Sequence, residues 1–336
     1  MAGHYKTVLV ACPGNAMTAG PEAIHQLVAD LVRLGQPAAV VYFPFDRTFD
    51  TAVPYRKYHA PVVPYRDVAG ELIVFPEIVT TYALKVRHAV AAIWWMSVNN
   101  FTCVRYGHPW RDKIRYFKYT LKGLRPWGGV QALKHLKNFA QSDYAMKFLA
   151  GNGIDGVLLS DAIPVYTTPA YLQEVRGKRA MAVRSNRILF NPHKGKKITQ
   201  QLIAAFPDWD FMPLAGYNRE QLADIFLGSK MYMDFGHHPG KDRLPREAAI
   251  HGCCVITGLN GSAGNDIDVP IPAAYKFDTN DAAFVEKFGR QVQRLIEDFD
   301  HCSAEFDHYR DIISREQLEF DRQIVHAFGI TSETRQ

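Results

Sequence analysis

A polar loop stands directly before an apolar run in the stretch MDFGHHPGKDRLPREAAIHGCCVITG, residues 233 to 258. Asp242 and Glu247 supply carboxylates, and four basic side chains could meet an anion: His237, His238, Lys241 and Arg243. Pro245 suits the first turn of a helix, where its missing N–H costs nothing. The pattern therefore predicts a strand, an anion-binding loop, and a helix whose N-terminus offers free N–H donors and a positive dipole.

The same residues also have a simpler explanation. Taken singly, Glu247 is better explained as a charge near a helix N-terminus, and Arg243 as part of a solvated basic loop. Taken together, they cluster at the expected carboxyl end of a strand, where ligands of open α/β sheets bind. The cluster therefore favours a binding function, in which Glu247 could accept hydrogen bonds from ribose hydroxyls.

An alternation of strands and helices is expected to position this loop. The first part contains a helix over 20–35 and a strand–helix–strand segment over 138–164, whose helix Ser142 or Asp143 caps. Its remaining strands are expected at 7–13, 37–45, 71–79 and 91–97. Strand, helix and strand in succession predict a parallel sheet that is buried on both faces.

A second alternation follows an irregular stretch, 164–187, which we expect to be a linker. Its helices are expected at 198–206, 218–229 and 245–252, and its strands at 187–192, 209–216, 230–236 and 253–258. Residues 281–330 read as helical.

The chain is therefore expected to be an α/β protein of two Rossmann-like domains that face each other across a cleft. The domains are expected at 1–165 and 180–280, and residues 281–336 should form C-terminal helices that close the structure by packing back across both. The cleft between two such domains is the expected ligand site.

Composition narrows the class of protein. A chain of 336 residues predicts two domains, and 47% hydrophobic with 22% charged residues is typical of a globular protein. No segment stays apolar for the roughly 18 residues that span a bilayer, and the N-terminus is a poor signal peptide. Five cysteines without C-x-x-C spacing predict neither a disulfide framework nor a zinc site, so we expect a cytoplasmic protein.

The segment RLPREAAIHGCCVITG, residues 243–258, resembles the donor-binding motif of GT-B glycosyltransferases, above all the retaining family four (glycosyl transferases group 1) of bacterial polysaccharide biosynthesis. The resemblance implies that Glu247 holds the nucleotide ribose, and that the backbone at Leu244 and Pro245 lies against the nucleotide. It further implies that the next loop offers backbone amides to the diphosphate, with Gly261, Ser262 and Ala263 as candidates.

Three further segments are similar to the same family, at 20–35, 140–163 and 188–216. The first two resemble parts of the acceptor lobe, and the third resembles the opening of the donor lobe. In the third, FNPHKG implies that Lys194 binds phosphate, with Asn191 in the same donor site.

The sequence also departs from the family pattern. The family places an acidic residue eight positions before its glutamate, and here that position is Pro239; Asp234 or Asp242 is the candidate replacement. A family arginine after the first donor-lobe strand is missing, and Arg243 is the candidate to supply its charge. The expected catalytic groups are therefore Lys194, His238, Asp242 and Arg243.

The resemblance implies transfer of a sugar from a nucleotide-diphosphate sugar to a glycan or lipid-linked acceptor, with retention of configuration. The implied setting is surface polysaccharide assembly, such as capsule or lipopolysaccharide. Since GT-B enzymes bind the diphosphate with amides and basic side chains, no metal or other cofactor is expected besides the nucleotide-sugar co-substrate. In the acceptor lobe, the candidates for the cleft are Gly20, Glu22, Glu77 and Asn99.

Two alternatives stay open on the same fold. The His-Pro turn at His238 is also similar to GT-B enzymes that use CMP-activated acidic sugars of the sialyl or Kdo type, in which that turn faces the phosphate. The second alternative is a GT-B module without catalysis that binds a glycan or a membrane.

Residues 105–137 hold nine Lys or Arg and one acid, so the net charge of +5 is concentrated there. Cations with Trp and Tyr suit an anionic membrane surface, and the candidate contacts in this insert, about 104–138, are Trp110, Arg111, Lys113, Arg115, Lys118 and Trp127. The same composition suits single-stranded nucleic acid, but its place in the acceptor lobe favours the inner face of the cytoplasmic membrane, and no nucleic-acid partner is expected. The remaining alternative is a solvated helical surface whose aromatic rings turn inward.

Overall fold

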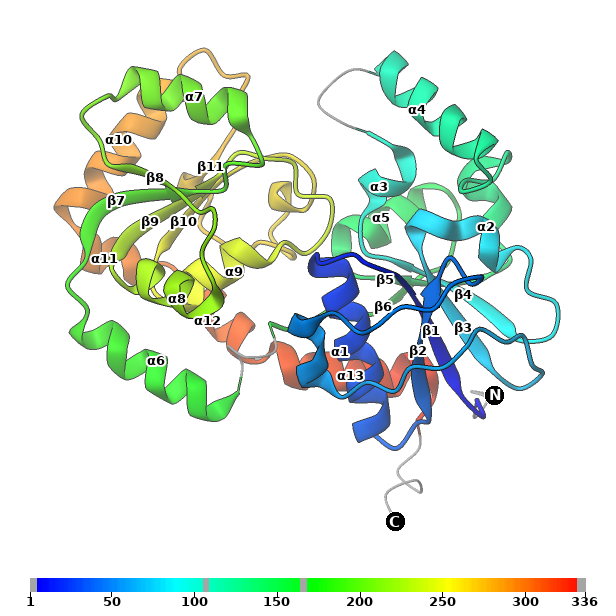
Figure 1. Ribbon diagram of the computed structural model, residues 1–336. Helices are drawn as coiled ribbons and strands as arrows, with labels where there is room; N and C mark the ends of the chain where they lie inside the picture. Colours follow the sequence, from blue (N-terminus) through cyan, green and yellow to red (C-terminus); the bar gives the residue numbers. More distant parts are fainter. Residues whose placement is uncertain (1–4, 105–108, 164–167, 331–336) are drawn as a thin grey trace. The chain divides into compact units, whose positions relative to one another are not determined.

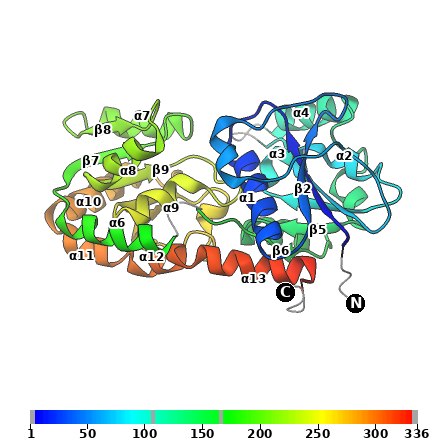
Figure 2. The ribbon, with the colours of Figure 1, turned by 60° about the horizontal axis from the view of Figure 1, so that its bottom comes forward.

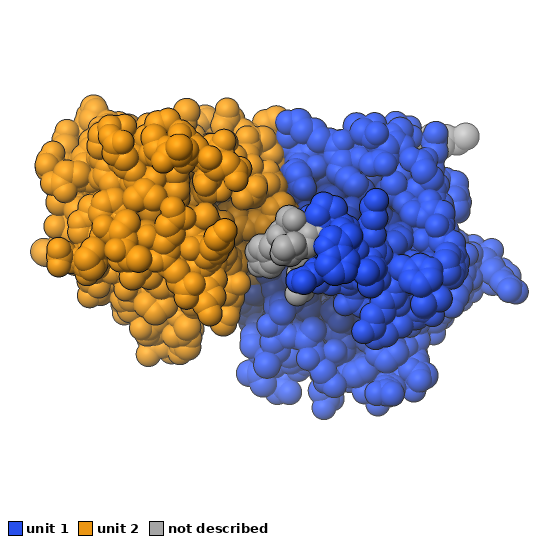
Figure 3. Space-filling model, turned by 90° about the horizontal axis from the view of Figure 1, so that it is seen from above, with its two compact units in different colours: residues 1–161, 318–336 blue, residues 162–317 orange. Residues whose placement is uncertain are grey.

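The computed structural model describes residues 5–104, 109–163 and 168–330, which form two compact units (Figures 1 and 3). Unit 1 comprises residues 1–161 with 318–336, and unit 2 comprises residues 162–317. Each contains a parallel sheet packed against helices, which confirms the predicted α/β class and the two Rossmann-like folds. Unit 1 therefore contains segments from both ends of the chain.

The sheet of unit 1 has six parallel strands in the order β2-β1-β3-β4-β5-β6. Alternate residues of β1 enter different cores: Val8 and Val10 join one cluster, and Leu9 joins the cluster on the other face. Both faces are thus buried, as expected for a parallel sheet. The strands are β1 (Val8–Pro13), β2 (Ala38–Phe43), β3 (Leu72–Pro76), β4 (Val90–Trp95), β5 (Lys137–Ala140) and β6 (Val157–Leu158).

Helices cover both faces of this sheet. One of them begins after Ser142, and the predicted cap there is confirmed, because Ser142 Oγ accepts a hydrogen bond from the Ala145 N–H at 3.2 Å. Phe320 and Ile324, near the C-terminus, pack into the same core as β1 and the first helix. The red helix that carries them runs along unit 1 in Figure 2. The helices are α1 (Ala19–Arg33), α2 (Thr80–Ala83), α3 (Val98–Thr102), α4 (Pro109–Leu121), α5 (Asp143–Gly151) and α13 (Glu316–Phe328).

The sheet of unit 2 has five parallel strands in the order β11-β10-β9-β7-β8. These strands are β7 (Ser185–Phe190), β8 (Phe211–Pro213), β9 (Ser229–Asp234), β10 (Cys254–Gly258) and β11 (Lys276–Phe277). The helices are α6 (Pro169–Met181), α7 (Lys196–Ala205), α8 (Arg219–Leu227), α9 (Arg243–Ile250), α10 (Phe284–Glu297), α11 (Phe299–Ala304) and α12 (Asp307–Ser314). The predicted helical character of 281–330 is confirmed, and β7, β9 and β10 place their carboxyl ends at one edge.

The linker predicted at 164–187 is wrong in its described part. Pro169–Met181 forms α6, and β7 already begins at Ser185. Thr168 caps α6 by accepting a hydrogen bond from the Tyr171 N–H, and Pro169 occupies the first helical position. The helix has little apolar periodicity, with Val175 as its buried residue, which explains why the sequence pattern missed it. Residues 164–167 lie outside the described part of the chain.

Among the described residues, no helix combines the length and the apolar character that a membrane crossing requires.

Candidate functional site

The carboxyl edge of the unit 2 sheet carries a cluster of ionic side chains. β9 ends at Asp234, which is buried, and the loop 235–242 leads from it to α9. His238 lies within this loop and is fully buried, while Asp242 directly precedes the helix. Lys194, from the connection between β7 and α7, places its Nζ 2.6 Å from Asp242 Oδ2. The strand order thus brings residues far apart in sequence to one edge.

The His238 ring lies between two carboxylates. Its Nδ1 is 3.0 Å from Asp242 Oδ2, an ion-pair distance without the alignment of a hydrogen bond, and its Nε2 is 3.6 Å from Asp234 Oδ1. Asp234 is held in place by hydrogen bonds from the Tyr232 hydroxyl at 3.1 Å and from the Gly236 N–H at 2.8 Å. The Nε2 also lies 3.4 Å from the Asp234 carbonyl oxygen, so two carboxylates and a carbonyl group together orient the imidazole.

These contacts set the protonation states of the cluster. Burial alone would lower the pKa of His238, but the facing Asp234 and Asp242 raise it to about 10. Burial alone would raise the pKa of Asp242, but His238 and Lys194 lower it well below its ordinary value. At neutral pH the cluster thus holds two carboxylates, an imidazolium and an ammonium, and their mutual pairing makes the burial of charge tolerable.

Two glycines allow the loops that carry Lys194 and Asp234 to touch. Gly195 has a φ of +60°, and a Cβ there would lie 2.8 Å from the backbone nitrogen of Gly236. A Cβ at Gly236 would in turn lie 2.5 Å from Lys194 Cβ. Such distances are too short for carbon atoms, so glycine at both positions is what brings Lys194 over the cluster.

The loop after β10 packs against the same cluster. Gly261 has a φ of +70° and forms an isolated parallel bridge with His238, and a Cβ at Gly261 would overlap the His238 carbonyl oxygen. The Ser262 N–H donates to that carbonyl oxygen at 2.8 Å, and Ser262 Oγ donates to the Gly240 carbonyl oxygen at 2.6 Å. Ser262 therefore holds the two loops together in this structure and does not offer the free amide that was expected; Ala263 is fully buried beside it.

The first two turns of α9 carry the rest of the predicted donor motif. Pro245 is buried, Arg243 and Leu244 are partly buried, and Glu247 is 8% exposed. At the end of β7, Asn191 Oδ1 accepts a hydrogen bond from the His193 N–H at 3.0 Å, which shapes the turn that leads to Lys194. All the predicted donor-site residues thus lie in the loops and the helix at this edge.

A buried ion pair that sequence reasoning missed anchors the start of α9. Arg246 Nη1 donates to Glu316 Oε2 at 2.8 Å, and Lys241 Nζ lies 2.9 Å from Glu316 Oε1. Arg246 also donates to the carbonyl oxygens of Lys241 and Asp242. Since the partners are far apart in the sequence, no local pattern could have found the pair.

Part of the cluster has the spacing of a metal site. Asp234, His238 and Asp242 each offer an atom, and these atoms lie within 4.8 Å of one another. However, Asp242 already pairs with Lys194, and His238 is a cation at neutral pH. The negative charge of the two carboxylates is already balanced by Lys194 and His238. A metal ion would have to displace a proton from His238 before it could bind there.

The acceptor candidates of unit 1 lie in different surroundings. Glu77 follows β3 and is buried; burial raises its pKa to about 7, although the Met96 N–H donates to it at 3.2 Å and the Asn100 amide at 3.4 Å. Asn99, after β4, accepts a hydrogen bond from the Tyr144 hydroxyl at 3.3 Å. Because β3 and β4 are neighbours, both residues reach the carboxyl edge of this sheet.

The other two acceptor candidates belong to α1. Glu22 is partly buried and pairs with Lys57 Nζ at 2.7 Å and with the Tyr58 hydroxyl at 2.9 Å. A Cβ at Gly20 would meet only Met96 Cε, at 3.9 Å, so nothing steric requires glycine there. Glu22 therefore forms an ion pair and a hydrogen bond within unit 1. At Gly20, packing leaves room for a side chain.

The basic insert forms α4 and the turn that follows it. Trp110 is 60% exposed and Trp127 is 72% exposed, and Phe117 is also exposed, so the alternative with the aromatic rings turned inward is wrong for these three. Arg111, Lys113 and Lys118 are exposed as well. By contrast, Arg115 turns toward the body of unit 1, where it donates to the Cys103 carbonyl oxygen and to Asp112. Arg105 and Tyr106 of the insert lie outside the described residues.

Comparisons with known proteins give a fold and no sequence family. No protein-family model matches the chain, and no curated protein matches it. Solved structures match over nearly its whole length. HepE of Anabaena, in complex with UDP-glucose, matches with a TM-score of 0.63 at 11% identity, over 96% of this chain and 99% of that chain.

Two further structures agree. WaaG, a glycosyltransferase involved in lipopolysaccharide biosynthesis, matches with a TM-score of 0.61 at 11% identity, over 97% of this chain and 100% of that chain. Sucrose-phosphate synthase of Thermosynechococcus elongatus matches with a TM-score of 0.64 at 10% identity, over 96% and 98%. All three have the GT-B fold, and this protein therefore has the GT-B fold that its sequence resemblance implied.

Proposed function

We propose that this protein is a retaining, metal-independent glycosyltransferase that uses a nucleotide-diphosphate sugar. The acceptor is a glycan or a lipid-linked glycan of bacterial surface polysaccharide assembly. The observation that carries the proposal is the ionic edge of unit 2, where Lys194 and the first turns of α9 meet at the carboxyl ends of β7 and β9. This is the part of an open α/β sheet at which ligands bind. The fold shared with HepE, which binds UDP-glucose, supports the choice of donor class.

Lys194 and Asp242 are the members of the cluster that a ligand can reach. Their side chains are 27% and 23% exposed, whereas His238 and Asp234 are buried. A diphosphate that arrives at this edge would replace Asp242 as the partner of Lys194. Negative charge builds on the diphosphate as the glycosyl bond breaks, and a preorganised donor aimed at such charge contributes about 3 kcal/mol.

Asp242 is the better candidate for the donor-sugar contact that the family assigns to an acidic residue. Both carboxylate oxygens of Asp234 already accept hydrogen bonds, one from the Tyr232 hydroxyl and one from the Gly236 N–H. Asp242 lies at the surface end of the cluster, beside Lys194. Release of Lys194 to the diphosphate would leave Asp242 paired with His238 alone and able to accept a hydrogen bond from a sugar hydroxyl.

The geometry counts against the CMP-sugar alternative. That alternative needs His238 to meet a phosphate, but the imidazole is fully buried and both of its ring nitrogens face carboxylates. A phosphate would have to enter between those negative groups, which electrostatics disfavours.

A panel of nucleotides tests the proposal. UDP, GDP, dTDP, ADP and CMP would each be added to the protein with EDTA or with magnesium, and the midpoint of thermal unfolding would be measured. A ligand at a hundred times its Kd adds about 2.7 kcal/mol to the native state, which is readily seen. We expect one diphosphate to raise the midpoint equally under both conditions. A shift with CMP alone would support the alternative, and a shift that requires magnesium would contradict metal independence.

The second part of the proposal is contact of α4 with an anionic membrane. Trp110, Ile114 and Leu121 recur at helical spacing and are all exposed, which leaves an apolar stripe on the outside of the helix. Lys118 and Lys122 lie beside it and are exposed too. An apolar stripe flanked by cations is the pattern of a helix that lies in the headgroup region.

A further inference from the structure

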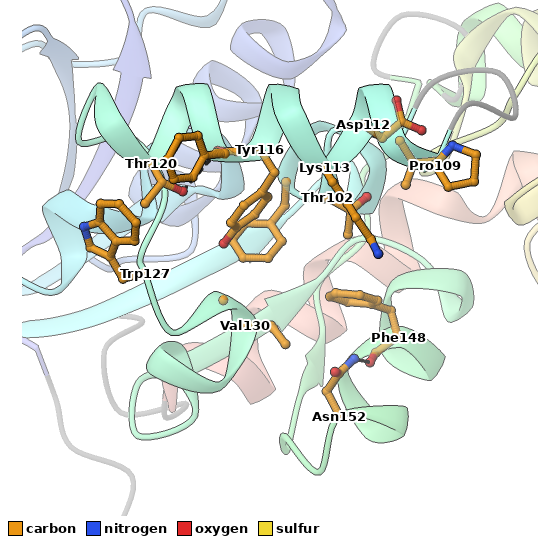
Figure 4. A pocket seen from close by; sticks show the side chains of 14 residues that line it. Thr102, Pro109, Asp112, Lys113, Tyr116, Thr120, Trp127, Val130, Phe148 and Asn152 are labelled. Carbon is orange, nitrogen blue, oxygen red and sulfur yellow. Dashed lines mark hydrogen bonds between the residues drawn. The ribbon is translucent and has the colours of Figure 1, made fainter.

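A large open pocket lies in unit 1, beneath α4. Its volume is about 740 Å³, within the range of pockets that bind small ligands. Figure 4 shows α4 above the cavity, with Val130, Phe148 and Asn152 on the opposite side. Those three come from the segment 129–133, from α5 and from the residue that follows α5.

The lining is mostly hydrocarbon. Phe101 and Phe148 line the cavity from α3 and α5, Tyr116 and Phe117 line it from α4, and Trp127 lies at the end shown beside Thr120 (Figure 4). Asp112 also lines the cavity, but its carboxylate pairs with Arg115. A mostly apolar lining of this size favours an apolar ligand, because binding removes apolar surface from water.

One cation reaches the cavity from its roof. Lys113 is exposed, lines the cavity, and in Figure 4 its side chain extends from α4 toward Phe148. Its ammonium group therefore suits an anionic head group attached to the apolar occupant.

We infer that this cavity binds the hydrocarbon chain of a phosphate-headed lipid, with the phosphate at Lys113. The apolar stripe on the outer face of α4 would place the helix at the level of lipid head groups, from which a chain can enter beneath it. If the proposed transfer is correct, this lipid is the acceptor's anchor, and only that identification rests on the proposed function. Binding of the chain itself does not require a nucleotide or a sugar.

The chain-length dependence of binding gives the first test. Hexyl, octyl, decyl and dodecyl phosphate would be titrated as monomers, and tryptophan fluorescence would report binding. The Trp110→Phe variant removes the tryptophan of the exposed stripe and keeps Trp127 on the cavity wall. Burial of each added methylene should lower the Kd about fourfold until the chain fills the cavity. A Kd that does not change with chain length would overturn the inference.

Two variants separate the cavity from the outer face of α4. Val130→Trp fills the cavity and should weaken octyl phosphate binding at least tenfold, whereas Ile114→Ser changes the exposed stripe and should leave it unchanged. Ile114→Ser should instead weaken binding to phosphatidylglycerol vesicles. Equal loss of octyl phosphate binding in both variants, or none in a Val130→Trp protein whose circular dichroism is that of the wild type, would contradict the inference.

The head group has its own control. Lys113→Gln should weaken binding of octyl phosphate and leave octanol binding unchanged, because only the phosphate carries charge. This variant and the chain-length series keep the inference testable if Val130→Trp does not fold. None of these binding experiments contains a nucleotide, so their result is independent of whether the donor site is as proposed.

Discussion

His238 holds a proton at neutral pH because two carboxylates face its buried ring. The structure raises its pKa from an ordinary value of 6.5 to about 10, and the neighbours responsible are Asp234 and Asp242. In the unfolded chain these neighbours are absent, and the imidazole titrates near its ordinary value. The native state therefore binds this proton more tightly than the unfolded state does.

This difference predicts how stability depends on pH. A raised pKa in the folded state stabilises fully below pH 6.5, and the stabilisation is lost as the pH rises toward 10. The free energy of unfolding of the wild type should therefore fall relative to that of His238→Gln between these two values. Urea unfolding at intervals of pH measures the difference, and titrations common to both proteins cancel. A difference that stays constant or grows over the window would mean that the buried ring is neutral.

Gly261 gives a second prediction at the same scale. Gly261→Ala should destabilise the protein more than the 1–2 kcal/mol that a positive φ alone costs, because its Cβ would overlap the His238 carbonyl oxygen. Gly216→Ala is the matched control: Gly216 has a φ of +79°, but nothing lies within 4 Å of its added Cβ. Chemical denaturation compares the two. Equal losses would show that the contact between the loops contributes nothing.

The positions of the candidate residues could be predicted from the sequence, but the contacts between them could not. Asp242 and Glu247 stand at a helix start, which is a local pattern, and Lys194 was implied by the family resemblance. The burial of His238 and the closure of Ser262 onto its carbonyl oxygen depend on two loops that meet only in the folded chain. The same holds for the pair of Arg246 with Glu316.

At the scale of elements, α4 has an unusual distribution of side chains. It buries Asp112 and Thr120 and exposes the apolar stripe, which is the reverse of a helix that packs on a core. The basic and aromatic composition predicted a surface helix, but a single sequence could not orient the rings. Similarly, α6 lacks the apolar periodicity that reveals a helix, whereas α1 has it and was predicted.

The orientation of α4 predicts binding to anionic vesicles. Lys118→Gln together with Lys122→Gln should weaken binding to phosphatidylglycerol vesicles about fivefold per charge, since each cation near the surface contributes about 1 kcal/mol. Cosedimentation at several lipid concentrations measures the effect. Lys178→Gln with Lys287→Gln removes the same charge from unit 2 and should change little. A similar loss in both double variants would indicate attraction by net charge without a docking face.

At the scale of the whole molecule, the chain returns to unit 1 through α13. Phe320 of α13 is fully buried in the core that contains β1 and α1, although it follows the whole of unit 2 in sequence. The alternation of strands and helices predicted two Rossmann-like sheets correctly, because parallel sheets have a strong local pattern. C-terminal helices that pack back across both domains were predicted, but periodicity could not show which residues of α13 enter the core of unit 1.

This return predicts which unit a C-terminal substitution weakens. Phe320→Ala should destabilise unit 1 by about 3–5 kcal/mol, as expected for a large side chain removed from a core. Leu318→Ala, on the same helix but at an exposed position, is the control. Hydrogen exchange should show faster exchange in β1 and β2 of the Phe320 variant and unchanged exchange in β7 and β9. Faster exchange in unit 2 with unit 1 unaffected would contradict the assignment of α13.

The central claim, a nucleotide-diphosphate site at the ionic edge of unit 2, is tested most directly by titration calorimetry in EDTA. The nucleotide that raises the unfolding midpoint would be titrated into the wild type, Glu247→Gln and Glu220→Gln; Glu220 is an exposed glutamate in the first turn of α8. Loss of a charge-assisted hydrogen bond to ribose should weaken binding about tenfold to a hundredfold in Glu247→Gln and leave Glu220→Gln unchanged. Equal affinity in all three proteins, or no binding of any nucleoside diphosphate to the wild type, would contradict the account.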